Sequence, residues 1–343
     1  MTTPASPTLP TADTTTHTTS HWTSDVAPDT TLGMSPAWLD AQYNNRARVP
    51  EAVQHLQRWA ADSATARAQL LATGQAVLDV PYMHHPAWPA TAQTLDVFTP
   101  PPGAAPPAGG WPVLLFVHGG YWRALDKADH SFIAPPWVAP GRGAAERVAE
   151  GAGTGADEGA NEATGAGPGA VVVVPNYALC PAVRVSDITA QMQQAVAWVW
   201  RHIAPHGGNP ARITVVGHSA GGQVVGMLLS TPLSQWQALG VHAPAGAQAP
   251  LAPFPLRHGV SISGLFDLAP IQQTPFLADL GLTPEEAHAQ SPIHRPHTGG
   301  VLTAVVGGDE SEEFLRQNTL LCSPKATGKG ATSRLIPQGQ LKF

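Results

Sequence analysis

The segment Gly217-His-Ser219-Ala-Gly221 is where residue types and spacing first indicate chemistry. A serine hydroxyl is a weak nucleophile near neutral pH, so it needs exposure at a turn and a base within hydrogen-bond distance. Glycine two positions before and after the serine lets a strand and a helix approach closely, and G-x-S-x-G is the pattern of such a turn, the nucleophile elbow. Ser219 is therefore the candidate nucleophile.

The residues on either side of Ser219 support a turn of this kind. Residues 212–216 are rich in β-branched side chains and predict a strand, and residues 222–230 predict a helix. G-x-S-x-G also occurs by chance in Gly-rich turns, so the flanking strand and helix are what make the pattern specific.

The turn His118-Gly119-Gly120-Tyr121-Trp122 follows the apolar stretch 113–117 and is the second candidate for catalysis. Acyl transfer builds negative charge on a carbonyl oxygen, and each preformed backbone N–H donor aimed at that oxygen contributes about 2.7–4 kcal/mol. Glycines let the backbone approach a substrate closely. Alone this is an ordinary Gly-rich turn, but upstream of an elbow it is the arrangement found in α/β-hydrolases of the esterase and lipase type.

Composition excludes several classes of function. The chain of 343 residues carries a formal net charge of −6 and no basic cluster, so we expect no binding to nucleic acid or to an anionic membrane. Cys180 and Cys322 lie far apart and form no disulfide framework, which fits a reducing cytosol. The sequence shows no signal peptide and no apolar run long enough for a membrane span. We expect a soluble cytoplasmic protein without a cofactor. The sequence leaves open whether the protein forms a homodimer.

The chain divides into a tail and one domain. Residues 1–33 are rich in Thr, Ser and Pro and predict a disordered tail, and residues 34–343 predict a single α/β domain. Residues 141–169 are rich in Gly, Ala and Glu and predict a flexible surface insertion. The glycines of this insertion follow no strand, and "TGKGATS" lacks the earlier glycine of a P-loop, so no phosphate loop is expected.

The domain alternates predicted strands with predicted helices. Helical periodicity from residue 53 puts Val53, Leu56 and Trp59 on one face, after a turn at Ser35, and Ser186 is the expected N-cap of a helix over 187–203. Alternation of this kind predicts a doubly wound, largely parallel sheet. The other strands are expected at 93–100, 112–120, 170–177, 258–267, 300–310 and 332–337.

The motif "HGGYW" resembles the HGGxW motif of the kynurenine formamidase (arylformamidase) family, which has the α/β-hydrolase fold. The likeness covers residues 35–317 apart from the insertion, and it includes "AQYNNR", "GHSAG", "SGLFDLAPI" at 263–271 and "VVGGDESEEFLRQ" at 305–317. The resemblance implies hydrolysis of N-formylkynurenine to kynurenine and formate. It also implies an oxyanion hole made by the backbone N–H groups of Gly120, Tyr121 and Ala220.

The acid of the catalytic triad is expected after a late strand, because α/β-hydrolases carry Ser, Asp or Glu, and His in that chain order. The segment "LTAVVGG" over 302–308 supplies that strand, and Asp309 and Glu310 stand just beyond it. Alignment with the family pattern places Glu310 on the catalytic aspartate, so we favour Glu310 and keep Asp309 as the alternative. The acid would hold the imidazole in one tautomer and stabilise its charged form.

The base is not found at its expected position. In the kynurenine formamidases the histidine follows one more strand, in a pattern like Gly-x-Asn-His-Phe, and a closing helix comes after it. Here "TSRLIP" is the candidate for that strand, no histidine occurs after His297, and we expect the final His loop and the closing helix to be lacking. Three interpretations stay open: a truncated or frameshifted version of an active enzyme, which we favour; a non-catalytic member of the fold; or another histidine acting as the base.

Other histidines are weaker candidates for the base or for a metal. His218 is expected to point away from its neighbour Ser219, while His288, His294 and His297 precede the last strand. His84 and His85 have no third ligand at suitable spacing, so no metal site is expected. Three functions remain: an aryl formamidase, a small-acyl carboxylesterase of the hormone-sensitive-lipase type, and a non-catalytic protein that binds an aromatic ligand.

Overall fold

The computed structural model describes residues 34–139, 169–242, 255–320 except 297 and 299, and 331–336. The predicted tail over 1–33 lies outside these residues, and so does the predicted insertion over 141–169 apart from Gly169. Cys322 and His297 also fall outside them.

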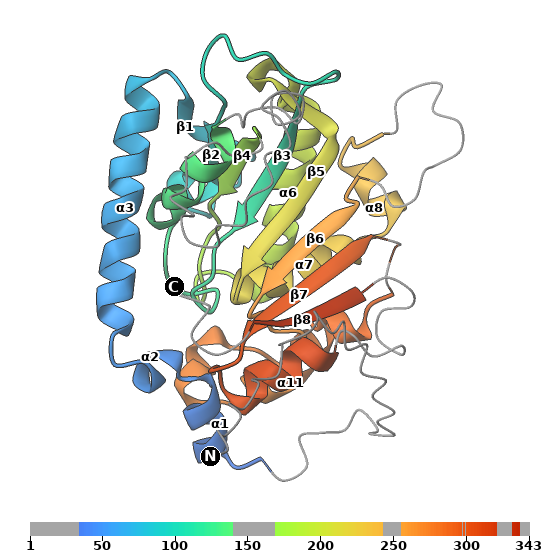
Figure 1. The fold of residues 1–343 in the computed structure, drawn as a ribbon. Helices are drawn as coiled ribbons and strands as arrows, with labels where there is room; N and C mark the ends of the chain where they lie inside the picture. The colour runs from blue at the N-terminus through green and yellow to red at the C-terminus, as the bar shows by residue number, and fades with distance from the viewer. Residues whose placement is uncertain are drawn as a thin grey trace, which may run out of the picture. The chain divides into compact units, whose positions relative to one another are not determined.

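The described strands form one eight-stranded sheet in the order β1-β2-β4-β3-β5-β6-β7-β8 (Figure 1). β1 and β2, and β2 and β4, pair antiparallel, and all other neighbours are parallel, which confirms the predicted mostly parallel sheet. The strands are β1 (Ala76–Pro81), β2 (Thr94–Phe98), β3 (Trp111–Val117), β4 (Val171–Pro175), β5 (Gly208–His218), β6 (His258–Ile262), β7 (Val301–Gly307) and β8 (Ala331–Ile336).

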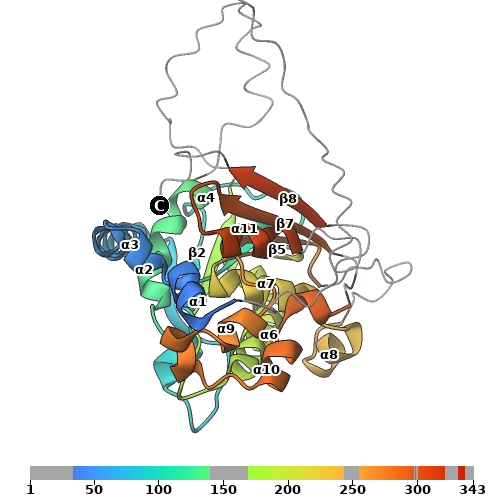
Figure 2. The same cartoon turned by 90° about the horizontal axis from the view of Figure 1, so that it is seen from below.

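Helices cover both faces of this sheet (Figure 2). Helices α6 and α7 pack on one face, and α3, α4 and the 3-10 helix η2 pack on the other. The helices are α1 (Pro36–Tyr43), α2 (Asn45–Arg48), α3 (Ala52–Ala72), α4 (Pro135–Val138), α6 (Val185–His202), α7 (Ala220–Leu229), α8 (Leu233–Ala238), α9 (Ala269–Gln272), α10 (Pro284–Ala289) and α11 (Glu312–Leu320). The 3-10 helices are η1 (Ala90–Gln93), η2 (Lys127–Ile133), η3 (Ala204–His206), η4 (Pro275–Leu280) and η5 (Pro292–His294).

Two apolar cores separate along the central strands. In β3, Val113 and Leu115 face α6 and α7, while Leu114 and Phe116 face α3 and α4. A parallel strand buried on both faces is apolar at successive positions rather than at alternate ones. No helix among the described residues is both long and apolar enough to cross a membrane.

Two local expectations were wrong. The residues after Ser35 form helix α1 rather than a turn, because the Ser35 hydroxyl caps the helix by accepting the N–H of Trp38 at 3.2 Å. Helix α6 begins after Arg184, two residues before the expected N-cap Ser186. The helix expected from residue 53 is α3; Val53 is 61% exposed on it, and its buried residues lie further along, at Ser63, Ala66 and Leu70.

A buried ionic cluster holds α3 and η2 against the sheet edge. The Lys127 Nζ lies 2.6 Å from an Asp79 carboxylate oxygen and 2.7 Å from one of Asp96, and Arg67 of α3 also pairs with Asp96. The Asp96 side chain is fully buried, so its charge depends on these two cations.

We predict that Lys127→Met lowers the free energy of unfolding by about 3 kcal/mol, because Asp96 then keeps only one of its buried cations. Urea denaturation followed by circular dichroism measures this. The matched control is Arg58→Ala, which breaks an exposed ion pair with Asp62 and should cost less than about 1 kcal/mol. Equal losses in the two variants would show that the buried cluster adds no more than a surface pair.

Candidate active site

Ser219 lies in the sharp turn between β5 and α7. Its backbone has φ 55° and ψ −117°, a strained conformation for a residue with a side chain. The Ser219 N–H donates to the carbonyl oxygen of Ile262 in the neighbouring strand at 2.8 Å, which fixes the turn to the sheet. The predicted strained strand-to-helix turn is therefore confirmed.

Gly217 and Gly221 permit this turn because the two backbones touch where side chains would be. A Cβ on Gly217 would lie 2.1 Å from the Gly221 carbonyl oxygen, and a Cβ on Gly221 would lie 2.1 Å from the Val117 carbonyl oxygen. Neither position accepts even an alanine without displacing backbone. The two glycines bring β5, α7 and the end of β3 together.

The turn after β3 lies directly against Ser219. A Cβ placed on Gly119 would stand 3.1 Å from the Ser219 Cβ. The next three residues, Gly120, Tyr121 and Trp122, have φ values of 102°, 49° and 56°. Within the described part of the chain, the backbone N–H groups of Gly120, Tyr121 and Ala220 donate no hydrogen bond to the protein. The three predicted oxyanion donors therefore remain available to a ligand.

Glu310 lies just after β7 with its carboxylate turned toward the end of β6. Its Oε1 accepts the hydroxyl of Ser263 at 2.6 Å and the N–H of Gly307 at 2.9 Å. Burial raises the pKa of Glu310, and these two hydrogen bonds oppose the rise. Asp309, in contrast, is exposed. This geometry favours Glu310 over Asp309 as the acid, and the role itself stays a prediction.

The ends of three neighbouring strands bring these groups side by side. His218 of β5 is in register with Ile262 of β6, and Ile262 is in register with Val305 of β7. The residues that follow β5 and β6 are Ser219 and Ser263, and Glu310 bonds to Ser263. Sequence reasoning assigned no role to Ser263. The one sequence feature that could have pointed to Ser263 is its position as the first residue of "SGLFDLAPI", a segment shared with the kynurenine formamidases.

Known proteins resemble this chain in sequence and in fold. Kynurenine formamidase of Danio rerio is 26% identical over 262 residues, covering 75% of this chain and 70% of the relative. The same enzyme of Salmo salar is 25% identical over 260 residues, covering 74% and 69%. The carboxylesterase family model matches residues 189–242.

The solved structure of a proposed thioesterase from Silicibacter sp. TM1040 is 28% identical, with a TM-score of 0.61, covering 87% of this chain and 90% of that one. Esterase B of Lactobacillus rhamnosis, at 14% identity and a TM-score of 0.52, shares the fold over 83% of each chain. The protein has the α/β-hydrolase fold. The resemblance of this hydrolase to the kynurenine formamidases, expected from its motifs, is confirmed.

Three of the histidines, His118, His130 and His218, lie behind the elbow on the α3 face. The His118 ring stacks on Tyr177 with centroids 4.2 Å apart and on His130 with centroids 5.4 Å apart. His218 meets Trp59 of α3 edge-on at 6.1 Å, so its ring lies on the face where we expected it, away from the helix that carries Ser219. His288 and His294 stack on each other at 4.2 Å between α10 and η5, and neither contacts Ser219 or Glu310 among the described residues.

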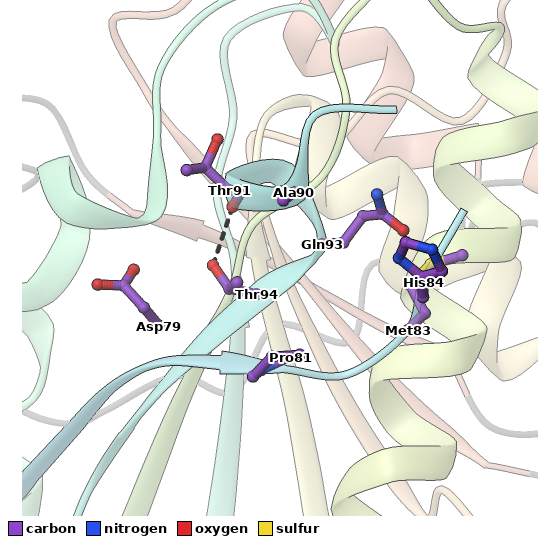
Figure 3. A pocket seen from close by; sticks show the side chains of 8 residues that line it. All are labelled: Asp79, Pro81, Met83, His84, Ala90, Thr91, Gln93 and Thr94. Carbon is purple, nitrogen blue, oxygen red and sulfur yellow. Dashed lines mark hydrogen bonds between the residues drawn. The ribbon is translucent and has the colours of Figure 1, made fainter. Parts of the chain in front are cut away.

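A cavity of about 280 Å³ opens elsewhere, between the end of β1, the 3-10 helix η1 and the start of β2 (Figure 3). Asp79, His84 and Gln93 are among its lining residues, and none of the candidate catalytic residues lines it. The described residues hold no group of three or more side chains that could bind a metal ion.

We predict that the hydrolase loses stability as the pH falls from about 6.5 toward 4. Burial lowers the pKa of His130 and that of His218 to about 4, with a neighbouring histidine as the smaller cause in each. The unfolded chain binds these protons near pH 6.5 and the folded chain only near 4, so each group removes up to about 1.4 kcal/mol per pH unit in that window.

The check is the free energy of unfolding in urea at pH 7.5, 6 and 5 for the parent and for His130→Phe. The variant keeps a ring in the stack and loses one titrating group, so its stability should fall less steeply with acid. A slope equal to that of the parent would show that His130 titrates alike in the folded and unfolded chains.

Proposed function

We propose that this hydrolase cleaves aryl formamides, with N-formylkynurenine as the substrate, through Ser219 as the nucleophile. The likeness to two fish kynurenine formamidases over about three quarters of the chain supports the substrate class. One observation carries the mechanism: the strained Ser219 turn lies between the Gly119 turn on one side and Ser263 and Glu310 on the other. We also place the activity in the cytoplasm, since the cysteine pattern fits a reducing compartment.

In the proposed reaction, the Ser219 oxygen attacks the formyl carbon of the amide while its proton passes to a base. The carbonyl oxygen becomes an oxyanion and accepts the N–H groups of Gly120, Tyr121 and Ala220. The C–N bond then breaks, the proton goes to the leaving aryl amine, and a formyl ester forms on Ser219. Water hydrolyses this ester to formate and regenerates the serine.

The proposed role of Glu310 is to orient an imidazole and stabilise its protonated form. Its hydrogen bonds from Ser263 and Gly307 engage the same oxygen, Oε1, so the other carboxylate oxygen is left to face such a partner. The 343-residue sequence contains no histidine after His297. A protein made of these residues alone therefore needs another base for Ser219.

A small-acyl carboxylesterase is the second candidate function. The carboxylesterase family model matches residues 189–242, a range that contains the elbow. The same nucleophile and oxyanion donors serve esters and amides, but an ester releases a better leaving group and depends less on protonation of that group. Amide and ester substrates therefore distinguish the two functions.

We predict slow release of formate from N-formylkynurenine by the 343-residue chain, at a rate no more than about 10³–10⁴ times that in water, because it has no histidine after His297 to act as the base of the triad. Replacing the residues after Pro337 with Gly-Leu-Asn-His-Phe and a helix like that of the family should raise kcat by orders of magnitude. Formate release is measured for the chain, the extended chain and the extended chain with Ser219→Ala, with p-nitrophenyl acetate as the ester arm.

Each arm has an outcome that contradicts a part of the proposal. Full activity in the chain without the extension would point to a base other than a histidine after β8. Activity that survives Ser219→Ala would remove Ser219 as the nucleophile. Turnover of the acetate ester without release of formate would establish the carboxylesterase function instead.

A further inference from the structure

The turn after β3 stores backbone strain at two residues that are not glycine. Tyr121 and Trp122 have φ values of 49° and 56°, directly after Gly120 at 102°. A left-handed conformation costs a residue with a side chain roughly 1–2 kcal/mol. Such strain persists only where surrounding contacts fix it, and it concentrates at functional sites. The contacts that hold these two residues therefore bear on how the turn works.

Both strained side chains end in a hydrogen bond to a fixed group. The Tyr121 hydroxyl donates to the backbone oxygen of Tyr43 at 2.6 Å. The indole Nε1 of Trp122, a fully buried residue, donates to Oε1 of Gln223 at 3.1 Å. The Trp122 carbonyl oxygen also accepts the N–H of Cys180 at 2.8 Å.

The side-chain amide of Gln223 is completely buried, and both of its ends are engaged. Its Nε2 donates to the Gln290 carbonyl oxygen at 2.8 Å, while its Oε1 accepts from Trp122. An indole nitrogen only donates and a carbonyl oxygen only accepts, so the amide has one orientation that satisfies both neighbours. Leucine or methionine would fill the same space but would form no hydrogen bond with the Trp122 indole or with the Gln290 carbonyl oxygen.

Gln223 also belongs to the helix that begins at the nucleophile. Its backbone N–H donates to the Ser219 carbonyl oxygen at 3.2 Å, so the residue lies in the first turn of α7, after Ser219 and Ala220. The Gln223 side chain thus connects α7 to the turn after β3. Helix α7 follows Ser219 and carries the Ala220 N–H, and the turn carries the N–H groups of Gly120 and Tyr121.

We propose that Gln223 is a positioning residue for the oxyanion site, acting through Trp122. Its amide sets the spacing between the two parts of the site, Gly120 and Tyr121 in the turn and Ala220 in α7. The proposal rests on the function proposed above. Displacing a reacting or stabilising group by about 1 Å costs on the order of 10²-fold in rate, so loss of this bond should weaken the tetrahedral state far more than ground-state binding.

The test measures a tetrahedral mimic and a ground-state ligand separately, and it needs no turnover. Phenylboronic acid accepts an electron pair from the Ser219 oxygen, releases the serine proton to solvent, and presents a boron hydroxyl where the oxyanion would form. Kynurenine, the proposed product, lacks the formyl group and reports binding alone. Calorimetry gives both affinities for the parent, Ser219→Ala, Gln223→Met, Trp122→Phe and the double variant of the last two.

Gln223→Met should weaken boronate binding about ten- to a hundredfold, with kynurenine affinity within about twofold of the parent. Trp122→Phe removes the donor from the other side and should give the same loss, and the double variant should be no worse than either single one. This shared loss distinguishes action through one hydrogen bond from two independent defects. Trp122→Phe also carries the test if Gln223→Met does not fold.

Thr189→Val is the matched control. It removes another buried hydrogen bond, from the Thr189 hydroxyl of α6 to the side-chain oxygen of Gln290 at 2.8 Å, and it leaves the Gln223 bond to the Gln290 backbone oxygen and the Trp122 bond in place. It should lower stability and leave boronate affinity unchanged. Equal weakening by Thr189→Val would mean that general loosening, not positioning, explains the effect.

Two failures are distinguishable. If the parent and Ser219→Ala bind the boronate with equal affinity, Ser219 is not the nucleophile. That result would contradict both the proposed function and the role of Gln223. If the parent binds through Ser219 and Gln223→Met binds equally well, the proposed function stands and the positioning role is wrong.

Discussion

The direct contact between the backbones of β5 and α7 is the constraint on which the candidate site depends. A methyl group added at Gly217 would lie only 2.1 Å from the Gly221 carbonyl oxygen, so β5 and α7 meet with no side chain between them. This contact forces the connecting residue, Ser219, into a conformation that few residues adopt. It also brings the first N–H groups of α7, which have no partner within the helix, to the same place as the serine.

The parallel sheet extends this local arrangement into a site. Because β5, β6 and β7 run the same way, the residues that leave them emerge at one edge, and Ser219, Ser263 and Glu310 follow one another across it. Ligands of open α/β sheets bind outside the carboxyl ends of the strands for this reason. The α3 face presents rings instead: His118, His130 and His218 lie behind the elbow, and burial lowers the pKa of each.

The features that could be predicted are those set by local sequence. The run of valines in β4 predicts a strand because both of its faces are buried, and the two glycines predict the elbow because no other residue fits there.

The bulged strand β1 was not predicted from the sequence. Its Asp79 has φ 57° and is held by Lys127 and by the Asp96 carboxylate, which accepts the Asp79 N–H at 2.9 Å, and these partners lie far away in the sequence. The contacts of Ser263 and Gln223 were invisible for the same reason, since a side-chain amide or hydroxyl has no periodicity that reveals its partner.

Helix α1 links the two ends of the described chain through one residue. The backbone oxygen of Tyr43 accepts a hydrogen bond from the Tyr121 hydroxyl. The hydroxyl of Tyr43 donates to Glu313 of α11 at 2.5 Å and accepts a hydrogen bond from the Gln317 side-chain amide at 3.0 Å. Helices α1 and α11 lie side by side in Figure 1. Tyr43 leaves the ribosome 270 residues before Glu313. During synthesis, α1 must therefore wait for nearly the whole sheet to be made before its contacts can form. We therefore expect the strained turn beside Ser219, which bonds to the same helix, to reach its final conformation late in folding, after the nascent chain already carries the nucleophile.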